Sequence, residues 1–389
     1  MIISRLILKN WRNFSSIDVQ LGYRVFIVGP NASGKSNILD ALRFLRDIAK
    51  SEGGGLQKAV SDRGGIPKIR CLAARRKSTI EILVHLSESE NDEPKWKYEI
   101  GITREEKGIH KPIIKFEKVW SGDECILNRP NEDDKKDIIR KRQTHLEQLD
   151  KNEKFREIVH FFESVRYIHL VPQLIRSHHL TNDSLNVDDP FGKGFLERIA
   201  KTSKRIQESR LKRIGKALQK AVPQLVELKL YKDVTGLSHL EAGYEHWQPE
   251  PAKQNEEQFS DGTLRLIGLL WTILEGEKSK GNFLLLLEEP ELSLHPGIIR
   301  RLPGLMWRFQ KGMWQIFIST HSPDLFFDTG IGLNEILLLK PDKEGTTVEV
   351  ASMRKDIKAL LDSGFSIPEI VVPETEPQNI IQLNLFNGK

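Results

Sequence analysis

The chain has 389 residues, of which 39% are hydrophobic and 29% charged, a composition typical of one large or two small globular domains rather than a disordered chain. Its 59 basic and 54 acidic residues leave a formal net charge of +5, which by itself does not indicate a nucleic-acid partner. The longest apolar stretch, 266–274, is far shorter than the roughly 18 residues of a membrane span, and the spacing of the two cysteines excludes a disulfide framework or a zinc site. We expect a cytoplasmic protein with no membrane partner.

The chain begins with strands. Residues 3–9 and 17–21 alternate apolar and polar side chains, and the apolar run 23–28 indicates a buried strand that stops at Gly29. Apolar residues at helical spacing then predict a helix over 36–48. The order is therefore two short strands, a buried strand, a glycine-containing loop and a helix.

The character of the sequence changes after this helix. Within 79–121, three segments alternate with a period of two and are separated by polar turns, which predicts antiparallel sheet. Residues 131–163 have evenly mixed charge, and we interpret them as a solvated helical arm rather than a binding surface. Residues 49–163 are thus expected to form an antiparallel β subdomain with a short helical arm.

The second half returns to alternating strands and helices. Residues 164–176 are predicted to be a strand and 194–222 a helical segment. A helix from about 261 to 274 is followed by two buried strands over 283–289 and 315–320.

The apolar strands 23–28, 283–289 and 315–320 each run into polar residues at their carboxyl ends. This arrangement is typical of a parallel α/β sheet whose ligand lies at the strand ends. The remainder, 333–389, is expected to contain one strand pair, a short helix over 353–363 and a polar tail.

The segment from Gly29 to Ser36 reads GPNASGKS, a complete G-x-x-x-x-G-K-[ST] phosphate loop. Its backbone N–H groups and the following helix N-terminus would surround the phosphates, Lys35 would reach the β and γ oxygens, and Ser36 would ligate Mg²⁺. The alternative is a glycine- and serine-rich turn that matches by chance. The predicted strand before it and helix after it disfavour that alternative.

Paired carboxylates end the second apolar strand, in the run FLLLLEEP. Glu288 is in position to hold the Mg²⁺ shell, and Glu289 to orient the attacking water and accept its proton. Two solvated acids at a strand end are the alternative, which the upstream phosphate loop makes the weaker interpretation.

Two further motifs allow two interpretations each. In FSDGT, Ser260 or Asp261 is an ordinary helix N-cap, or alternatively Ser260 and the helix N-terminus form part of a phosphate site. In STHSP, His321 is either a packed residue at a strand end or a contact to the γ-phosphate.

GPNASGKS, FSDGTLR, LLLLEEPELSLHP and FISTHSP, in this order, resemble the heads of ABC-class ATPases. More narrowly they resemble the RecF, structural-maintenance-of-chromosomes (SMC) and OLD branch, and most of all the bacterial stand-alone "predicted ATPase" (AAA ATPase) group of defence-type operons. The resemblance implies an α/β P-loop NTPase with an ABC-type head: a central, mostly parallel sheet, an antiparallel β subdomain and a helical insertion. It suggests an ATPase core over 1–48 and 164–345, a β subdomain with an arm over 49–163, a basic helical segment over 194–225, and a C-terminal helix and tail over 346–389.

The resemblance also implies roles for single residues, with ATP and Mg²⁺ as cofactors. Phosphates and Mg²⁺ would be bound by a loop comprising Gly29, Asn31, Ala32, Ser33, Gly34, Lys35, Ser36 and Asn37. Glu288 stands in the metal position, Glu289 is the catalytic base, and His321 is the switch histidine. Ser260 and Gly262 would complete the ATP site of a second protomer in a head-to-tail dimer. Gln173 is a candidate for the loop glutamine that touches Mg²⁺, and Arg12 for a nucleotide contact.

Two positions depart from the pattern of the family. The metal position, usually Asp, is Glu288 here, which keeps the charge on a longer side chain. The signature reads SDGT instead of SGGQ, so that Asp261 would repel an incoming phosphate unless its carboxylate points away.

We therefore expect a Mg-dependent ATPase that dimerises, or forms a larger homo-oligomer, around ATP and controls a separately encoded effector in a possible anti-phage defence role. The resemblance implies that OLD-type nucleases carry a C-terminal Toprim domain with a Glu and an Asp-x-Asp pair. Because 321–389 contains no Asp-x-Asp pair, we do not expect this chain to be a nuclease. The alternatives are a RecF-like repair ATPase that binds duplex DNA directly, and a scaffold with a structural ATP site. The Lys and Arg residues of 194–220 either contact DNA phosphates or form the solvated face of a helix.

Overall fold

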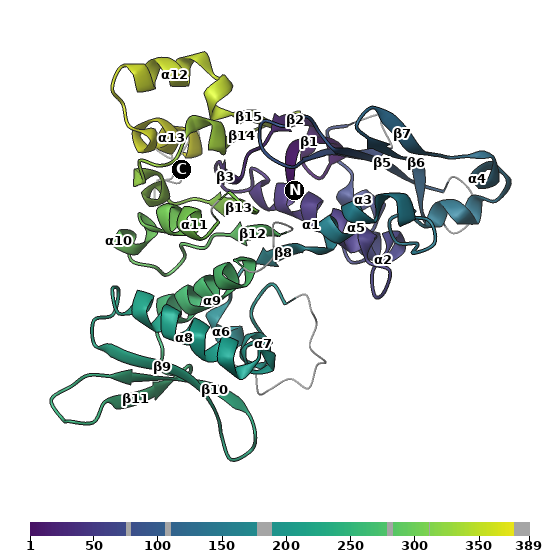
Figure 1. Ribbon diagram of the computed structural model, residues 1–389. Coiled ribbons are helices and arrows are strands. Elements are labelled where there is room, and N and C mark those ends of the chain that lie inside the picture. The colour runs from purple at the N-terminus through teal and green to yellow at the C-terminus, as the bar shows by residue number, and fades with distance from the viewer. Residues whose placement is uncertain (75–78, 106–109, 177–188, 278–282, 311, 377–389) are drawn as a thin grey trace, which may run out of the picture. The chain divides into compact units, whose positions relative to one another are not determined.

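The computed structural model describes residues 1–74, 79–105, 110–176, 189–277, 283–310 and 312–376 (Figure 1). The C-terminal residues 377–389, part of the predicted tail, therefore lie outside the described residues. Contacts divide the chain into two units: a first unit of 1–165, 281–286 and 312–389, and a second unit of 166–280 and 287–311.

An antiparallel sheet of six strands makes up much of the first unit. Its spatial order is β2-β1-β4-β5-β6-β7, and every neighbouring pair is antiparallel. The strands are β1 (Ile2–Trp11), β2 (Phe14–Gln20), β4 (Ile80–Ser87), β5 (Trp96–Arg104), β6 (Pro112–Ser121) and β7 (Glu124–Arg129). Buried and partly exposed residues alternate along β4, as the period of two predicts, because one face of the sheet packs on the core. The predicted antiparallel sheet is confirmed.

A second six-stranded sheet has the order β15-β14-β3-β13-β12-β8. Its strands are β3 (Arg24–Val28), β8 (Val165–Ile168), β12 (Leu284–Glu288), β13 (Gln315–Thr320), β14 (Ile336–Asp342) and β15 (Gly345–Val350). Strand β3 pairs in parallel with both β13 and β14, whereas β15 runs antiparallel to β14. All residues of β3 and β13 are buried, as expected of strands covered on both faces. The predicted α/β fold, with a central and mostly parallel sheet, is confirmed.

Helix α1 (Lys35–Ala49) follows β3 and contacts α2 and α5. The other helices of the first unit are α2 (Leu56–Ser61), α3 (Ile66–Ile69), α4 (Glu132–Lys136), α5 (Arg156–Glu163), α12 (Lys355–Asp362) and α13 (Ile367–Thr375). Helix α12 confirms the helix predicted over 353–363. Helix α13 was not predicted, because its Pro368 and Pro373 suggest a loop, although a proline in the first turn of a helix needs no N–H partner.

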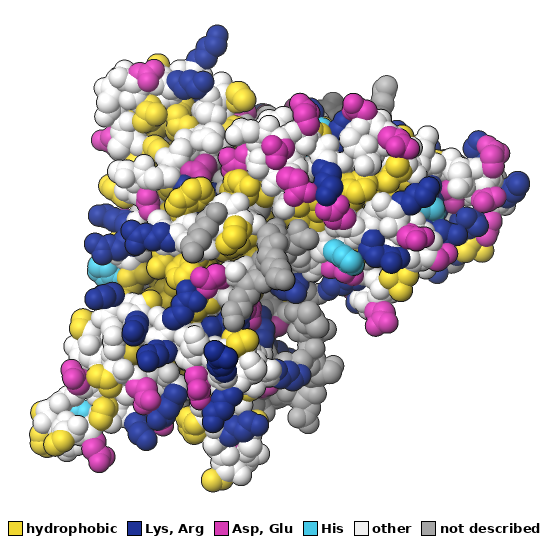
Figure 2. Space-filling model, in the orientation of Figure 1, with side chains coloured by type: hydrophobic (Ala, Val, Ile, Leu, Met, Phe, Trp, Pro, Cys, Tyr) yellow, Lys and Arg dark blue, Asp and Glu magenta, His cyan; other side chains and the backbone are white. Residues whose placement is uncertain are grey.

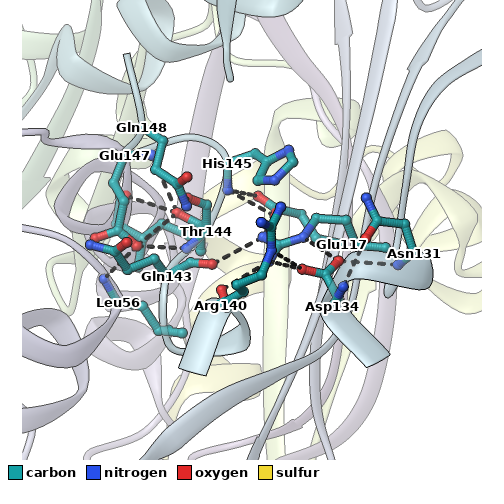
Figure 3. Close-up of polar contacts among 12 residues, drawn as sticks. Leu56, Glu117, Asn131, Asp134, Arg140, Gln143, Thr144, His145, Glu147 and Gln148 are labelled. Carbon is teal, nitrogen blue, oxygen red and sulfur yellow. Dashed lines mark hydrogen bonds and ion pairs between the residues drawn. The ribbon is translucent and has the colours of Figure 1, made fainter. Parts of the chain in front are cut away.

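The arm predicted over 131–163 is less helical than expected, although most of its charged residues are exposed as predicted. Only the short helices α4 and α5 form there, with single 3₁₀ turns between them, and several polar residues of this segment are buried. Asp134 is buried because the guanidinium of Arg129 forms ion pairs with it and with Glu117, two acids that Figure 3 labels. The mixed charge of this segment thus lies mostly on exposed side chains, and among its acids Asp134 is the one that is buried.

The second unit combines helices with a three-stranded antiparallel sheet of order β11-β10-β9. The strands are β9 (Leu225–Lys232), β10 (Ser238–Tyr244) and β11 (Ala252–Asn255). The helices are α6 (Pro172–Arg176), α7 (Phe195–Lys201), α8 (Lys204–Leu218), α9 (Asp261–Gly276), α10 (Pro296–Ile299) and α11 (Leu302–Gln310). Helix α9 is apolar on nearly all sides, and α6, α8 and α11 pack against it.

Two predictions for this unit need correction. The strand expected over 164–176 ends at Ile168, and Pro172 begins α6, because proline fits the first turn of a helix but cannot donate to a sheet. The helical segment 194–222 is two helices, α7 and α8, interrupted at Thr202 and Ser203. None of the helices among the described residues is long and apolar enough to cross a membrane.

Candidate nucleotide site

The phosphate loop joins β3 to α1 in a backbone conformation that few side chains allow. Gly34, the N-cap of α1, has φ of 100°, and Ala32 has φ of 61°. A Cβ on Gly34 would lie 2.2 Å from Nδ2 of Asn13, and one on Gly29 would lie 2.7 Å from the carbonyl oxygen of Leu339. Glycine is therefore required at both positions, because there is no room for a side chain.

Asn13 supports this loop from outside the motif. Its Nδ2 donates to the carbonyl oxygen of Ser33 and to Oγ1 of Thr346, each at 2.7 Å, and its Oδ1 accepts from Nδ2 of Asn37 at 2.7 Å. We did not predict a supporting role for Asn13. Asn13 directly follows Arg12, which we singled out instead.

The loop offers a cation and backbone amides to a bound anion. Lys35 is buried, and its ammonium donates to the carbonyl oxygens of Gly29 at 2.8 Å and Pro30 at 3.0 Å. The first turn of α1 contains no acidic residue, and Asn31, Ala32 and Ser36 are exposed. A helix N-terminus without acids and with a lysine beside it attracts phosphate.

One polar atom of the loop also points to a missing ligand or solvent molecule. The hydroxyl of Ser33 is buried and has no hydrogen-bond partner. Such a group costs free energy unless a further molecule satisfies it. Together with the glycine backbone and Lys35, the Ser33 hydroxyl makes the loop chemically suited to a nucleoside triphosphate.

Arg12 is engaged within the protein. Its guanidinium binds Oδ2 of Asp40 on α1, with the shorter contact at 2.9 Å, and donates to the carbonyl oxygen of Lys68 at 3.1 Å. Arg63 binds the other carboxylate oxygen of Asp40 at 2.9 Å. Arg12 thus fastens the β1–β2 turn to α1, and its contact with nucleotide stays a prediction.

His321 follows β13 at the edge of the sheet where the phosphate loop begins. The parallel register pairs Thr320 with Val28, the last residues of β13 and β3. His321 and Gly29 therefore follow paired residues, and His321 is exposed. This position is compatible with a contact to a bound phosphate and excludes the packed-residue interpretation.

In the second unit, Glu288 ends β12 and is held by one residue of β8 and one that follows it. The hydroxyl of Tyr167 donates to Oε2 of Glu288, and Nδ1 of His169 lies 3.3 Å from the carbonyl oxygen of Glu288. Glu289 follows with φ of 44°, an uncommon conformation for a non-glycine residue. We did not predict Tyr167 and His169 as neighbours of Glu288, because the alternating pattern around them only indicates a strand.

Helix α9 begins with the signature residues. The hydroxyl of Ser260 accepts from the backbone N–H of Thr263 at 3.2 Å, so its N-cap role is confirmed, while a role in phosphate binding stays a prediction. A Cβ on Gly262 would lie 2.5 Å from the carbonyl oxygen of Ser293, which explains the glycine. The start of α9 therefore packs tightly against the segment that follows Glu289.

Gln173 lies on α6, exposed, and not on the predicted strand. Its Nε2 donates to Oδ2 of Asp261 at 3.1 Å. Arg176, one helical turn later, forms an ion pair with Oδ1 of Asp261 at 2.7 Å and donates to the carbonyl oxygen of Phe259 at 2.6 Å. Gln173 thus binds the signature segment here, and its role as a ligand of Mg²⁺ stays a prediction.

Within the described parts of the chain, no cluster of three or more His, Cys, Asp or Glu side chains could hold a metal ion. Mg²⁺ prefers six oxygen ligands and usually combines one or two protein ligands with substrate phosphates and water. Ser36 and Glu288 carry oxygen atoms of this kind. Their role as ligands of a metal that is bound together with a nucleotide stays a prediction.

Comparison with known proteins places these motifs in one family. The family model described as "AAA domain, putative AbiEii toxin, Type IV TA system" matches residues 24–328, most of the chain. The DNA replication and repair protein RecF of Pasteurella multocida is 38% identical over 64 residues, and the Old nuclease of Escherichia phage P2 is 28% identical over 137 residues. These matches cover 16% and 32% of this chain but only 16% and 23% of the two relatives.

Two solved structures share the fold. One, described as the SmcHead bound to the C-winged helix domain of ScpA, has a TM-score of 0.55 at 14% identity and covers 90% of this chain and 98% of its own. The other, an Smc head domain with an extended coiled coil bound to the C-terminal domain of ScpA, derived from Pyrococcus furiosus, has a TM-score of 0.53 at 13% identity, with 93% and 99% covered. At these identities the likeness concerns the fold alone.

Proposed function

The chain belongs to this AAA-domain family and is an ATPase of the RecF, SMC and OLD type, and on that premise we propose that it is a molecular switch. Two protomers would associate head to tail around ATP, separate after hydrolysis, and thereby control a separately encoded effector. Any nuclease activity would reside in that effector. The observation that carries the proposal is the phosphate loop, with its glycine backbone, buried Lys35 and unsatisfied Ser33 hydroxyl.

The residues present define what each would contribute. When bound, Mg-ATP supplies a γ-phosphoryl group that water can attack. The Lys35 ammonium would neutralise the β- and γ-phosphates, with the amides of Asn31 to Asn37 around them. Ser36 and Glu288 would ligate Mg²⁺, and Glu289 would accept the proton of the attacking water. His321 would contact the γ-phosphate and so distinguish ATP from ADP.

The dimer and the effector rest on weaker support than the ATP site. The start of α9, with Ser260 and Gly262, is a helix N-terminus that is suited to a phosphate of a second protomer. The family description names a toxin of a toxin–antitoxin system, which supports a defence role. The two Smc heads are described as bound to domains of ScpA, which supports a protein partner for this chain.

The test measures molar mass in solution for the Glu289→Gln protein, in which hydrolysis should stop while ATP binding remains. Light scattering after size exclusion, with and without Mg-ATP, should show a doubling of mass with ATP. The control is Lys35→Ala in the same background, which should stay monomeric because ATP no longer binds. An unchanged mass for a Glu289→Gln protein that binds ATP as single protomers would exclude the head-to-tail switch.

Direct binding of duplex DNA is the second candidate. On α8, Lys204, Arg205, Lys212 and Lys216 are exposed and have no acidic partner among the described residues, whereas Arg213 pairs with Glu277. Lys and Arg side chains gather on this part of the surface, with acidic side chains among them (Figure 2). Such a face suits sequence-independent contact with phosphates.

This candidate predicts salt-sensitive DNA binding by the isolated protein. Lys212→Gln with Lys216→Gln, one turn apart on α8, should weaken binding of a short duplex about tenfold and reduce its salt dependence between about 50 and 200 mM NaCl. The matched control changes Lys97 and Lys118 of the antiparallel sheet to Gln. Fluorescence anisotropy that detects no DNA binding with or without Mg-ATP would leave the partner-effector switch as the remaining proposal.

A further inference from the structure

The signature segment contains a residue that conflicts with the role proposed for it. Asp261 is the first residue of α9, next to the amides and the Ser260 hydroxyl that would face a phosphate. A carboxylate in the first turn stabilises a helix through the helix dipole, but it also repels a second anion at the same place. The charge of Asp261 must therefore be balanced if α9 is to receive the phosphate of another protomer.

Two side chains of α6 bind this carboxylate, one at each oxygen. Arg176 contacts Oδ1 at 2.7 Å, and Gln173 donates to Oδ2 at 3.1 Å. They are three positions apart and therefore lie on one face of α6, which packs against α9. Arg176 also donates to the carbonyl oxygen of Phe259, just before the cap. The side chain of Arg176 is 23% exposed and that of Asp261 38% exposed, so the pair is reachable from solvent.

The other arginine of the segment cannot replace Arg176. Arg265 lies one turn further along α9 and is buried, with its Nε lacking a hydrogen-bond partner. Burial lowers the pKa of its guanidinium, and three carboxylates, those of Asp261, Glu289 and Glu291, oppose this shift. The charge of Arg265 is thus shared with the acids that follow β12, whereas Arg176 forms a direct ion pair with Asp261.

We propose that Arg176 is a positioning residue for ATP-driven association: it neutralises Asp261 so that the start of α9 can accept a phosphate of the partner's ATP. The inference rests on the proposed head-to-tail switch and deepens it. A signature with glycine at this position has no acid and therefore needs no such neutralisation. Gln173 holds the second oxygen, so that the carboxylate stays turned toward α6.

The test removes the charge of Arg176 and then removes the charge that it balances. In the Glu289→Gln background, Arg176→Gln should weaken the ATP-dependent association at least about tenfold, because an uncompensated carboxylate would face phosphate at each of the two sites of the dimer. Adding Asp261→Asn should restore association to within about threefold of the parent, because no charge is left to neutralise. Asp261→Asn alone should also stay within about threefold of the parent. Sedimentation over a protein concentration series measures the association constants.

A matched control lies at the other end of α9. Arg213 pairs with Glu277, the C-cap residue of α9, at 2.7 Å, and Arg213→Gln should leave association unchanged. A fluorescent ATP analogue should bind all variants with the parent's affinity, since the phosphate loop is unaltered.

Each remaining outcome overturns the inference. If Arg176→Gln associates like the parent, Arg176 has no positioning role. If the double variant stays as weak as Arg176→Gln, the arginine acts through the Phe259 carbonyl or the fold and not through Asp261. If the parent itself binds ATP but does not associate, the proposed switch is wrong, and this inference is wrong with it.

Discussion

Two arginines of this chain each bind acidic side chains, but in very different surroundings. Arg129 is 1% exposed, and all five of its N–H groups have acceptors: both oxygens of Asp134, one oxygen of Glu117, and the carbonyl oxygens of Arg140 and Gln143. Arg176 has one carboxylate and one carbonyl partner, and its Nε has no hydrogen-bond partner. The first guanidinium is saturated, and the second has spare donor capacity.

This difference separates a stabilising contact from an exchangeable one. The Arg129 centre continues into further bonds, because Glu117 also accepts from the backbone N–H of His145 at 2.9 Å (Figure 3) and from the Tyr98 hydroxyl at 3.2 Å. A fully bonded buried network fixes one arrangement of the chain, and breaking it leaves buried charges unpaired. A half-exposed pair with an open donor can exchange partners at small cost. We therefore expect Arg129 to govern stability and Arg176 to govern association.

The largest effect is expected for Arg129→Met. The substitution keeps much of the side-chain volume but leaves the carboxylates of Glu117 and Asp134 buried without a counter-charge, so the free energy of unfolding should fall by about 3–5 kcal/mol. Urea unfolding followed by circular dichroism measures this change. ATP affinity at temperatures where the variant is folded should stay unchanged, because the phosphate loop is intact.

Arg140→Met is the control for this experiment. Arg140 is 40% exposed, and its closest acid is Asp134 at 3.6 Å. Its substitution should cost less than about 1 kcal/mol. A similar loss of unfolding free energy in both variants would mean that the burial of Arg129 does not increase its contribution to stability.

The two arginine centres also mark the limit of what the sequence could predict. Local patterns determine strands β3 and β13, helix α1 and the phosphate loop, namely apolar runs, helical spacing and a motif of eight residues. The bounds of these elements were therefore predicted within one or two residues. The Arg129 centre joins separate segments of the chain through Glu117, Asp134 and His145. No periodic pattern in the sequence connects these three residues. Mixed charge over 131–163 suggested solvent exposure, which holds for most of its charged residues, but it could not show that Asp134 is buried against Arg129.

The candidate site shows the same division. Gly29 to Ser36 and Glu288 follow from motifs, and the structure places them at the ends of β3 and β12 as expected. The side chains that bind the residues of these motifs could not be predicted from the sequence. Tyr167 next to Glu288, and Arg176 next to Asp261, come from positions that are remote in sequence, and Pro172 within an otherwise strand-like segment concealed α6. Only the three-dimensional fold shows how the acid of the signature is balanced.

An effect of intermediate size is expected from pH, again at the Arg129 centre. Burial, together with the charge of Arg129, lowers the pKa of His145 from 6.5 to about 4. Between these two values the unfolded chain binds a proton that the folded chain does not, so stability should fall as the pH decreases from 6.5 to 4. We expect a decrease of about 1–3 kcal/mol over this range. The pKa of Asp134 is lowered to about 2, so its stabilising charge persists throughout.

His145→Gln tests this assignment. Urea unfolding at several pH values between 7 and about 4.5 should show a weaker pH dependence for the variant than for the wild type. The difference between the two proteins isolates the imidazole from Glu117, whose pKa is raised by burial and which acts in the opposite sense. Parallel pH profiles would show that His145 titrates alike in the folded and the unfolded chain, in conflict with its burial.

The smallest effect on stability is expected for Arg176→Gln, although this variant should impair association. The pair with Asp261 is partly solvated, so its loss, with that of the Phe259 contact, should lower the free energy of unfolding by about 1 kcal/mol. Thermal unfolding beside Arg213→Gln, which breaks a pair of equal length at the far end of α9, provides the comparison. A loss of 3 kcal/mol or more, as large as that expected for Arg129→Met, would make Arg176 a structural residue. A small loss of stability combined with a large loss of association is what distinguishes a charge that prepares α9 for a phosphate from one that holds the fold together.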